Sequence, residues 1–410
     1  MKIVINDLLR AVSTALDHVE AQVVGVTTHH AQRVAYLAVL TGKETGLEMD
    51  ELVYLTAAAL LHDIALFGFI DEKGKNVAIQ YWLDEEIKGH CTEGEKDVQG
   101  LPFYPRIKDA ILYHHERADG DGPFGKTTAE TPLFARLIHL GDALDTEFDL
   151  NEVSEEKYNK LIQFVREQSG SCFDKECSAA FCQAFSYDAL THVAGDNIRT
   201  ALDDLIPRRE WDMTSDELMK FADIFARITD IKSTFTYEHS RGIAQKAYEM
   251  AESYYKWDEG TAQRLYFAGT LHDIGKLMIH SDILEKPDKL TNEEYTEIQN
   301  HAMGTYQILS AVKGLEEITS WAALHHEKLD GSGYPFGKTA GELGEKERLM
   351  ACLDIYQALV EKRPYKDGMP HAKAMEILRA MADKGQLDAA ITSDIDKYYS
   401  GAQKISDQKN

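Results

Sequence analysis

The stretch Leu271-His272-Asp273-Ile274-Gly275-Lys276 sets an imidazole beside a carboxylate inside an apolar run, and a lysine follows three residues after the aspartate. Polar groups are costly in apolar surroundings unless they have partners. Two explanations fit the hexapeptide alone. Either it ends a helix, with a capping aspartate and a hydrogen-bonded core histidine, or it binds a ligand that needs both groups. The rest of the chain decides between them.

The first half of the chain contains a second copy of this stretch, Leu61-His62-Asp63-Ile64. Other anchors recur around both copies. In the first half they are His30, His62, His90, His114 and Asp142, at intervals of 32, 28, 24 and 28 residues. In the second half they are His239, His272, His301, His325 and Asp354, at intervals of 33, 29, 24 and 29 residues. A register kept this closely indicates an internal duplication.

Helical periodicity dominates the sequence. There are only nine prolines, and apolar residues recur at i, i+3, i+4 and i+7 in segments 50–62, 155–167, 215–230, 258–272, 291–312 and 370–382. Thr291 and Glu294 are expected to cap one of these helices, and Gly314 to follow its end. The sequence therefore predicts an all-α protein of two tandem helical bundles related by duplication.

A length of 410 residues is enough for two domains. The last helix of the first unit is expected at about 173–185, followed by a polar join that includes Gly195, Pro207, Arg208 and Arg209. We therefore expect one domain over residues 1–205 and another over residues 206–410.

The charge and hydrophobicity of the sequence argue against some classes of protein. A net charge of −25 disfavours binding to a nucleic-acid polymer, and a small anionic ligand would need local cations. No apolar run reaches the roughly 18 residues of a membrane span. The N-terminus reads as an amphipathic helix rather than a signal peptide, so we expect a cytoplasmic protein without a membrane partner. The oligomeric state is open, a homodimer included.

The five cysteines predict no disulfide framework. Cys172, Cys177 and Cys182 match no usual metal spacing and are expected to be ordinary core or surface residues. Cys91 and Cys352 each lie close in sequence to a candidate metal ligand, and we expect them simply to pack there.

Imidazoles and carboxylates spread over several helices of a bundle can meet at one interior point, as metal ligands do. The second-unit candidates are His239, His272, Asp273, His301, His325, His326 and Asp354. The first-unit candidates are His30, His62, Asp63, His90, His114, His115 and Asp142. Five histidines and two aspartates are too many for one tetrahedral zinc, and they suit two ions with one bridging carboxylate. Donors without thiolate favour iron or manganese, with zinc, cobalt and nickel still open.

These residues resemble the HD-GYP phosphodiesterases of the HD hydrolase superfamily over most of residues 215–400, and a more diverged copy covers about 25–190. The motifs that carry the resemblance are His272–Lys276, Ile283–Pro287, His301, His325–Glu327, Asp330–Pro335, Asp354 and Arg363–Tyr365. The resemblance implies an all-helical fold, a metal centre and hydrolysis of a cyclic dinucleotide.

The resemblance also implies roles. His239, His272, Asp273 and Asp354 would hold one metal, and Asp273, His301, His325 and His326 the other. Lys276 would bind the scissile phosphate, while Arg363 and Lys366 would hold phosphate oxygens. Gly333, Tyr334 and Pro335 would line the substrate pocket. Independently of the resemblance, the same loop reads as an ordinary turn in which Gly331 and Gly333 supply flexible dihedrals. Glu327 and Asp330 would orient ligand histidines.

Two departures from the family pattern bear on the metals. Phe235 stands where some members place a glutamate that binds a third ion, so we expect two ions. Gln357 replaces an acidic residue three positions after Asp354, which is expected to weaken contacts around a ligand without removing one.

The first unit lacks the three cations. Leu66, Asn151 and Ser154 stand where Lys276, Arg363 and Lys366 stand in the second unit, and Asp121 adds a negative charge. We therefore expect the first unit to bind metal but to serve as a regulatory, dimerising or altered-specificity module.

The sequence thus predicts a cyclic dinucleotide phosphodiesterase with catalysis by Asp273 and Lys276 in the second unit. Cyclic di-GMP is the default substrate of the family, and the tandem architecture also resembles proteins that hydrolyse 3′3′-cyclic GMP-AMP. Two alternatives remain open at this stage: a signalling protein that binds the nucleotide without cleaving it, and another nucleotide phosphohydrolase of the HD superfamily.

Overall fold

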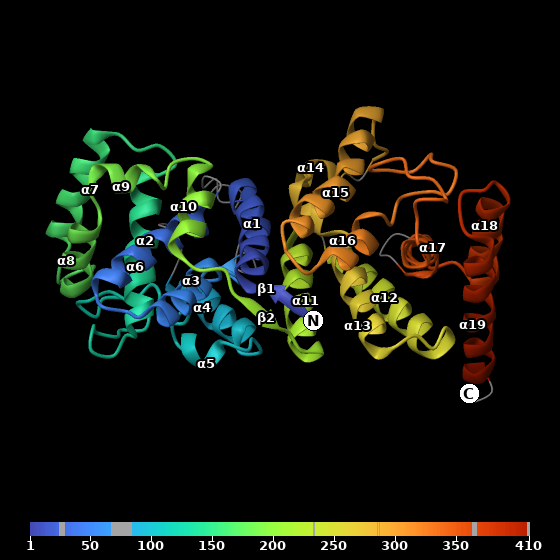
Figure 1. Cartoon of the computed structure of the whole chain (residues 1–410), viewed down its shortest axis with the longest axis horizontal. Coiled ribbons are helices and arrows are strands. Elements are labelled where there is room, and N and C mark those ends of the chain that lie inside the picture. The colour runs from blue at the N-terminus through green and yellow to red at the C-terminus, as the bar shows by residue number, and fades with distance from the viewer. Residues whose placement is uncertain are drawn as a thin grey trace. The chain divides into compact units, whose positions relative to one another are not determined.

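The computed structural model describes residues 1–23, 29–66, 84–232, 234–284, 286, 288–362 and 367–407. Within these ranges the chain is almost entirely helical (Figure 1). It divides into two compact units, one of Lys2–Asp212 and one of Met213–Asn410 together with Met1. The prediction of an all-α fold is confirmed, and the helices expected from periodicity are present.

The first unit is a bundle around α2, which packs against α3, α6, α8 and α10. Its helices are α1 (Ile5–Val23), α2 (His30–Glu44), α3 (Met49–Leu60), α4 (Asp84–Val98), α5 (Tyr104–Ile107), α6 (Leu133–Phe148), α7 (Glu155–Glu167), α8 (Lys175–Ala184), α9 (Tyr187–Thr191) and α10 (Asn197–Leu205). Most of α2 is buried, which fixes the position of His30 at its first turn.

A small sheet joins the two ends of the first unit. Strand β1 (Lys2–Val4) pairs antiparallel with β2 (Glu210–Asp212), and Ile3 lies opposite Trp211. The sequence analysis did not foresee this sheet, because three-residue strands carry no readable periodicity and their pairing is distant in sequence. The expected polar join is also more ordered than predicted, since it contains α9 and α10.

The second unit repeats the same core, with α12 packed against α13 and α17. Its elements are α11 (Ser215–Lys232), α12 (Thr234–Glu249), the π-helical turn η3 (Met250–Tyr254), α13 (Glu259–Leu271), the 3₁₀ turn η4 (Ile274–Met278), α14 (Ser281–Leu284), α15 (Asn292–Ser310), α16 (Glu316–Ala323), α17 (Glu345–Val360), α18 (His371–Asp383) and α19 (Ala389–Asp407). As predicted, Thr291 and Glu294 form a reciprocal capping box at the start of α15.

Gly275 sets how closely η4 and α15 approach each other. A Cβ atom at this position would overlap the carbonyl oxygen of His301 and the amide of Thr305. The amide of Gly275 instead donates to the Thr305 hydroxyl at 3.0 Å, and that hydroxyl donates to the carbonyl of His272 at 2.8 Å. These two hydrogen bonds connect His272, at the end of α13, to α15, the helix that carries His301.

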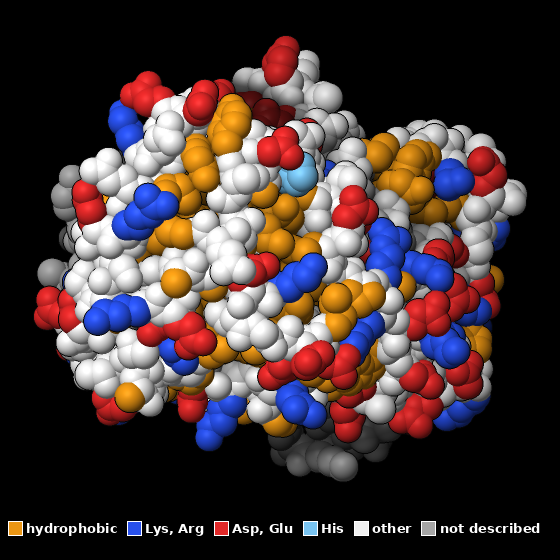
Figure 2. All heavy atoms as spheres, turned by 60° about the vertical axis from the view of Figure 1, so that its left-hand side comes forward, with side chains coloured by type: hydrophobic (Ala, Val, Ile, Leu, Met, Phe, Trp, Pro, Cys, Tyr) orange, Lys and Arg blue, Asp and Glu red, His pale blue; other side chains and the backbone are white. Residues whose placement is uncertain are grey.

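The surface carries mixed charge. On the face drawn in Figure 2, acidic and basic side chains are interspersed among apolar ones. Among the described residues, no helix combines the length and the apolar character needed to cross a membrane.

Candidate metal centres

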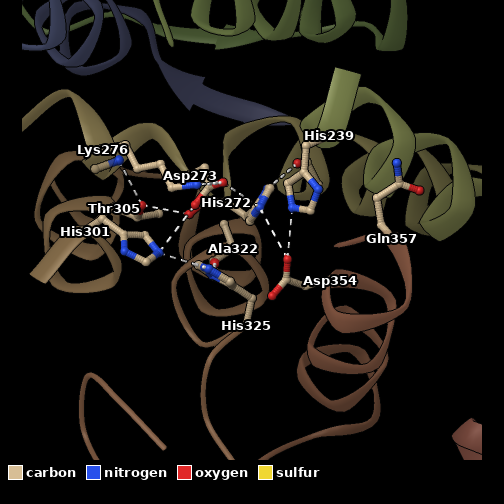
Figure 3. A network of polar contacts seen from close by, with 12 residues as sticks. His239, His272, Asp273, Lys276, His301, Thr305, Ala322, His325, Asp354 and Gln357 are labelled. Carbon is tan, nitrogen blue, oxygen red and sulfur yellow. Dashed lines mark hydrogen bonds and ion pairs between the residues drawn. The ribbon is translucent and has the colours of Figure 1, made fainter. Parts of the chain in front are cut away.

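The seven second-unit candidates converge from five parts of the bundle, and Figure 3 labels all of them except His326. His239 lies on α12, His272 and Asp273 follow α13, His301 lies on α15, His325 and His326 follow α16, and Asp354 lies on α17. Six of the seven are nearly inaccessible to solvent, and only His326 keeps a partly exposed side chain, at 28%. Among the described residues, the duplicated donors therefore form one buried polar cluster whose open side lies at His326.

The donors fall into overlapping groups whose ligand atoms lie within 4.8 Å of one another. The groups are His239, His272 and Asp354; His301, His325 and His326; and His272, Asp273 and His325. The two oxygens of Asp273 face different histidines, with Oδ2 at 3.2 Å from Nε2 of His272 and Oδ1 at 3.4 Å from Nε2 of His301. The two oxygens of this carboxylate therefore face donors of different groups.

Backbone carbonyls fix which ring nitrogen faces the cluster. Nδ1 of His272, His301 and His325 lies 2.8, 2.5 and 2.6 Å from the carbonyl oxygen three residues earlier. A carbonyl can only accept, so each Nδ1 must carry the hydrogen, and Nε2 of the neutral ring then presents a lone pair to the interior. Histidines that bind metals are commonly oriented in this way.

The distances within the cluster fit metal ions. Nε2 of His301 and Nε2 of His325 are 3.4 Å apart, although both are acceptors in the tautomer just described. Donors that share one ion at about 2.0–2.1 Å lie roughly 3–3.4 Å apart, depending on coordination geometry. Nε2 of His272 is buried without a hydrogen-bond partner. A cation between these lone pairs would satisfy groups that otherwise repel or stay unpaired, so the residues fit the metals that the sequence implies.

The acidic partner of His239 was missed by the sequence analysis. Nδ1 of His239 lies 2.8 Å from Glu361, which follows the last turn of α17, while Nε2 lies 3.1 Å from Asp354. Gln357, the expected weak point, packs against Gly242 and donates to Glu361 at 3.1 Å. A signal was present: a carboxylate seven residues after Asp354 falls on the same helical face as that ligand.

Ionisation states follow from this setting. Burial opposes a charge on His239, but hydrogen bonds to Asp354 and Glu361 outweigh it and raise the pKa of His239 to about 9. Burial lowers the pKa of His301 to about 4. The pKa values of Asp273 and Asp354 are lowered despite burial, because histidines surround both carboxylates and Lys276 adds to the effect at Asp273. The aspartates are therefore anionic at neutral pH.

Lys276 lies at the edge of the cluster. Its Nζ is 2.6 Å from Oδ2 of Asp273, and 23% of its side chain is exposed. The lysine thus contacts both the Asp273 carboxylate and solvent.

In the loop after His326, the acidic side chains have other hydrogen-bond partners than the sequence predicted. The buried carboxylate of Glu327 accepts from the amides of Phe336 at 2.7 Å and Lys338 at 2.9 Å, and Asp330 accepts from the amide of Ser332 at 3.0 Å. These acidic residues shape the loop, so the prediction that they orient ligand histidines was wrong.

Gly333 serves close packing rather than flexible dihedrals, because a Cβ there would overlap the backbone of Glu327 and Lys328. Gly331, with φ +79°, does adopt the left-handed conformation that favours glycine. Tyr334 follows and its ring centroid lies 4.7 Å from that of His326. The loop therefore places an aromatic ring, and Pro335 after it, beside the open side of the cluster.

The first unit repeats the arrangement. Nδ1 of His62 and of His114 lies 2.8 and 2.6 Å from the carbonyl three residues earlier, and Nε2 of His90 lies 3.4 Å from Nε2 of His114. Asp63 again reaches several histidines, at 3.2 Å from His62 and 3.5 Å from His114. His30 lies 3.3 Å and His115 3.7 Å from Asp142. All seven first-unit candidates are brought together.

The surroundings of the first centre differ from those of the second. Asp145, three residues after Asp142, lies 2.7 Å from Nδ1 of His30 and also binds the buried guanidinium of Arg33. Leu66, at the position of Lys276, is buried. Ser154, at the position of Lys366, caps α7 by accepting from the amide of Lys157.

Three expectations concern atoms that are not described. Arg363 and Lys366 lie outside the described residues, as does the side chain of Phe235. Their predicted roles remain predictions.

Comparisons with known proteins identify the fold. Models of the HD domain match residues 27–147 and residues 223–391. A 3′3′-cGAMP-specific phosphodiesterase 1 of Vibrio cholerae is 29% identical over 88% of this chain and 85% of its own length. A 3′3′-cGAMP-specific phosphodiesterase 3 of the same organism is 31% identical over 72% of this chain and 64% of its own length. A cyclic di-GMP phosphodiesterase of Pseudomonas aeruginosa is 32% identical over 38% of this chain and 37% of its own length.

A solved structure agrees with this result. The crystal structure of a cyclic GMP-AMP specific phosphodiesterase of V. cholerae, V-cGAP3, matches 96% of this chain and 97% of that chain with a TM-score of 0.67. Its sequence identity is 24%, so this likeness speaks for the fold. The chain therefore belongs to the HD superfamily and carries two HD domains in tandem.

Proposed function

We propose that this chain is a metal-dependent phosphodiesterase that hydrolyses a cyclic dinucleotide, 3′3′-cyclic GMP-AMP or cyclic di-GMP, in its second unit. The observation that carries the proposal is the meeting of six buried donors and the partly exposed His326 with Lys276 at the edge of the cluster. Two relatives that align with 72–88% of this chain are named for 3′3′-cGAMP. A further relative so named aligns with 39% of it, and relatives named for cyclic di-GMP align with 28–41%. This pattern favours 3′3′-cyclic GMP-AMP.

Two ions, iron or manganese, would be held in the second unit. His239, His272 and Asp354 would hold one ion, His301, His325 and His326 the other, and Asp273 would bridge them. When bound, such a pair supplies an activated hydroxide and stabilises charge on a phosphoryl group. The chain's own contribution is to orient the rings: carbonyls hold three Nδ1–H groups, and Glu361 holds that of His239.

Lys276 would receive the scissile phosphate. A lysine at the rim presents a compact positive charge where negative charge develops during phosphodiester cleavage. The attacking hydroxide would displace the 3′-oxygen, which opens the ring and leaves a 5′-phosphate. Tyr334 would stack on a base, since its ring lies beside His326 at the open side. Arg363 and Lys366 would hold the remaining phosphate oxygens.

The first unit would bind metal without cleaving the same substrate. It keeps the seven donors, but buried Leu66 stands at the position of Lys276, so no cation there can meet a phosphate. We assign this unit a regulatory role. We also place the enzyme in the cytoplasm, without a nucleic-acid polymer or membrane as partner, and a homodimer remains compatible with the proposal.

The test is to incubate protein loaded with iron or manganese with 3′3′-cyclic GMP-AMP, cyclic di-GMP and mononucleotides, and to identify products by mass spectrometry. We expect a linear dinucleotide with a 5′-phosphate, or mononucleotides after a second cleavage. Tight binding of the cyclic dinucleotides without cleavage by either metal form would show a binding protein instead. Cleavage confined to mononucleotides would show a different phosphohydrolase.

A further inference from the structure

The first unit carries a thiol where the second carries a methyl group. Cys91 follows His90 on α4, and Ala302 follows His301 on α15. Both side chains are completely buried. Sγ of Cys91 lies 3.7 Å from Nε2 of His90, a ring nitrogen that is also 3.6 Å from Asp63. The thiol therefore sits beside an atom that faces the centre.

The separations match those of atoms around one ion. Zinc lies about 2.0–2.1 Å from imidazole nitrogen and about 2.3 Å from thiolate sulfur. Tetrahedral angles then place two nitrogens about 3.4 Å apart and a nitrogen and a sulfur about 3.6 Å apart. Nε2 of His90 and Nε2 of His114 are 3.4 Å apart, and Sγ of Cys91 is 3.7 Å from the former. Sγ of Cys91 also lies 3.9 Å from Nδ1 of His114, so the thiol borders both of the rings whose Nε2 atoms face the centre.

Among the described residues, Cys91 is the one cysteine that joins such a group, with His90, His114 and His115. Cys352 offers a comparison, because it lies two residues from the candidate ligand Asp354 yet belongs to no group of donors in the described parts of the chain. Proximity in sequence to a ligand therefore does not by itself place a thiol among donors.

We propose that Cys91 is a metal ligand of the first unit, which gives this centre a mixed imidazole, carboxylate and thiolate donor set and a preference for a softer ion such as Zn²⁺. The inference rests on the proposed binding of metal by the first unit. On ligation the thiol loses its proton to solvent, and the thiolate binds the ion. The sequence had led us to expect a thiol that only packs.

The consequence is a division of metals within one chain. Thiolate favours zinc over manganese, whereas the second unit offers only nitrogen and oxygen donors. Zinc has no redox chemistry, so the first centre would keep its ion under conditions that oxidise iron in the second. Ala302, at the equivalent position of the second unit, has a methyl side chain that cannot bind a metal ion.

Cobalt(II) substitution tests the assignment directly. A thiolate bound to cobalt gives a charge-transfer absorption in the near ultraviolet that imidazole and carboxylate do not give. We would load the full-length protein with cobalt and compare wild type, Cys91→Ala and Cys91→Ser. The control is Cys177→Ala, which removes a buried thiol of the same unit that belongs to no donor group among the described residues. We expect the band in wild type and Cys177→Ala, and its loss in both Cys91 variants.

A competition experiment gives a second readout. Metal-free protein is offered equal zinc and manganese, and bound metals are counted by mass spectrometry. The first centre of wild type should take zinc, and Cys91→Ala should lose at least about tenfold of its preference for zinc, since removing a ligand costs no less than removing an outer partner. An unchanged band or an unchanged preference in Cys91→Ala overturns the proposal.

The variant Asp63→Asn distinguishes binding of metal by the first unit from ligation of that metal by Cys91. If this variant binds as much cobalt as wild type and neither protein shows the band, the first unit holds no metal through Cys91 and the thiolate assignment falls. If Asp63→Asn binds less cobalt but the band survives in Cys91→Ala, only the thiolate assignment falls. Neither result touches hydrolysis by the second unit, which is measured separately with the cyclic dinucleotides.

Discussion

Nδ1 of His239 lies 2.8 Å from a carboxylate oxygen of Glu361. In the first unit the same role belongs to Asp145, which lies 2.7 Å from Nδ1 of His30. The two carboxylates stand seven and three residues after their respective ligands, Asp354 and Asp142. Both units therefore place a carboxylate beside Nδ1 of the equivalent histidine, although the carboxylate comes from different positions in the sequence.

Glu361→Gln should weaken metal binding in the second unit by roughly 10- to 100-fold, because it removes the anionic partner of a ligand histidine. Titration of metal into the metal-free variant measures the loss. Glu345→Gln makes the same chemical change at an exposed position at the start of α17 and should have little effect. Equal affinities in wild type and Glu361→Gln would contradict the role given to Glu361.

The pH dependence of metal uptake follows from His239. Its pKa is raised to about 9, so the ring is protonated at pH 7.5 in protein without metal. Binding at Nε2 must release that proton, so metal affinity should rise as the pH increases to about 9. Calorimetry in buffers of different ionisation enthalpy counts the released protons. A metal affinity that does not change between pH 7 and pH 9 would contradict the release of a proton from His239.

The same shift affects stability in the opposite direction. A pKa raised above its unfolded value of about 6.5 stabilises the metal-free protein fully below that pH, and this contribution is lost as the pH rises through about 9.

Lys276→Met should lower turnover by about 10²- to 10³-fold while leaving the metal content unchanged, because it removes a charge that stabilises the developing negative charge. Lys397→Met is a suitable control, since Lys397 is exposed on α19 and pairs with Asp394, away from the candidate metal ligands. If metal content falls in parallel with turnover, the ion pair between Lys276 and Asp273 holds the centre together instead.

Gly333→Ala should destabilise the second unit by about 1–3 kcal/mol and impair substrate binding, because its Cβ would overlap the backbone of Glu327 and Lys328 and displace Tyr334. Gly341→Ala places the same methyl group where no atom lies within 4 Å and should be nearly neutral. Denaturant unfolding and the KM for the cyclic dinucleotide measure both effects. Equal behaviour of the two variants would show that the loop adjusts freely.

The sequence was sufficient to predict the bundle and the convergence of its donors, because both leave periodic or repeated signals. The anchors such as His272 and His301 could be aligned between the halves by their spacing alone. The capping box at Thr291 could also be predicted, since it depends on residues close together in the chain.

Contacts that depend on three-dimensional distance could not be predicted in the same way. The pairing of Ile3 with Trp211 joins the two ends of one unit, and short strands give no pattern. Glu327 appeared suited to orient histidines, yet its oxygens are taken by two loop amides. The repeat gives the spacing of the anchors but does not specify which face of α4 packs against the neighbouring helices. It therefore could not show whether the Cys91 side chain points toward the metal centre or into the apolar core.

The division of labour between the units is tested most directly by cleavage rates of Asp273→Asn and Asp63→Asn, both loaded with metal and given 3′3′-cyclic GMP-AMP. We predict that Asp273→Asn loses essentially all turnover, because the bridging carboxylate of the second centre is gone, while folded Asp63→Asn retains most of it. Complete loss of turnover in folded Asp63→Asn would contradict this division of labour, and full activity in Asp273→Asn would contradict the assignment of the chemistry to the second unit.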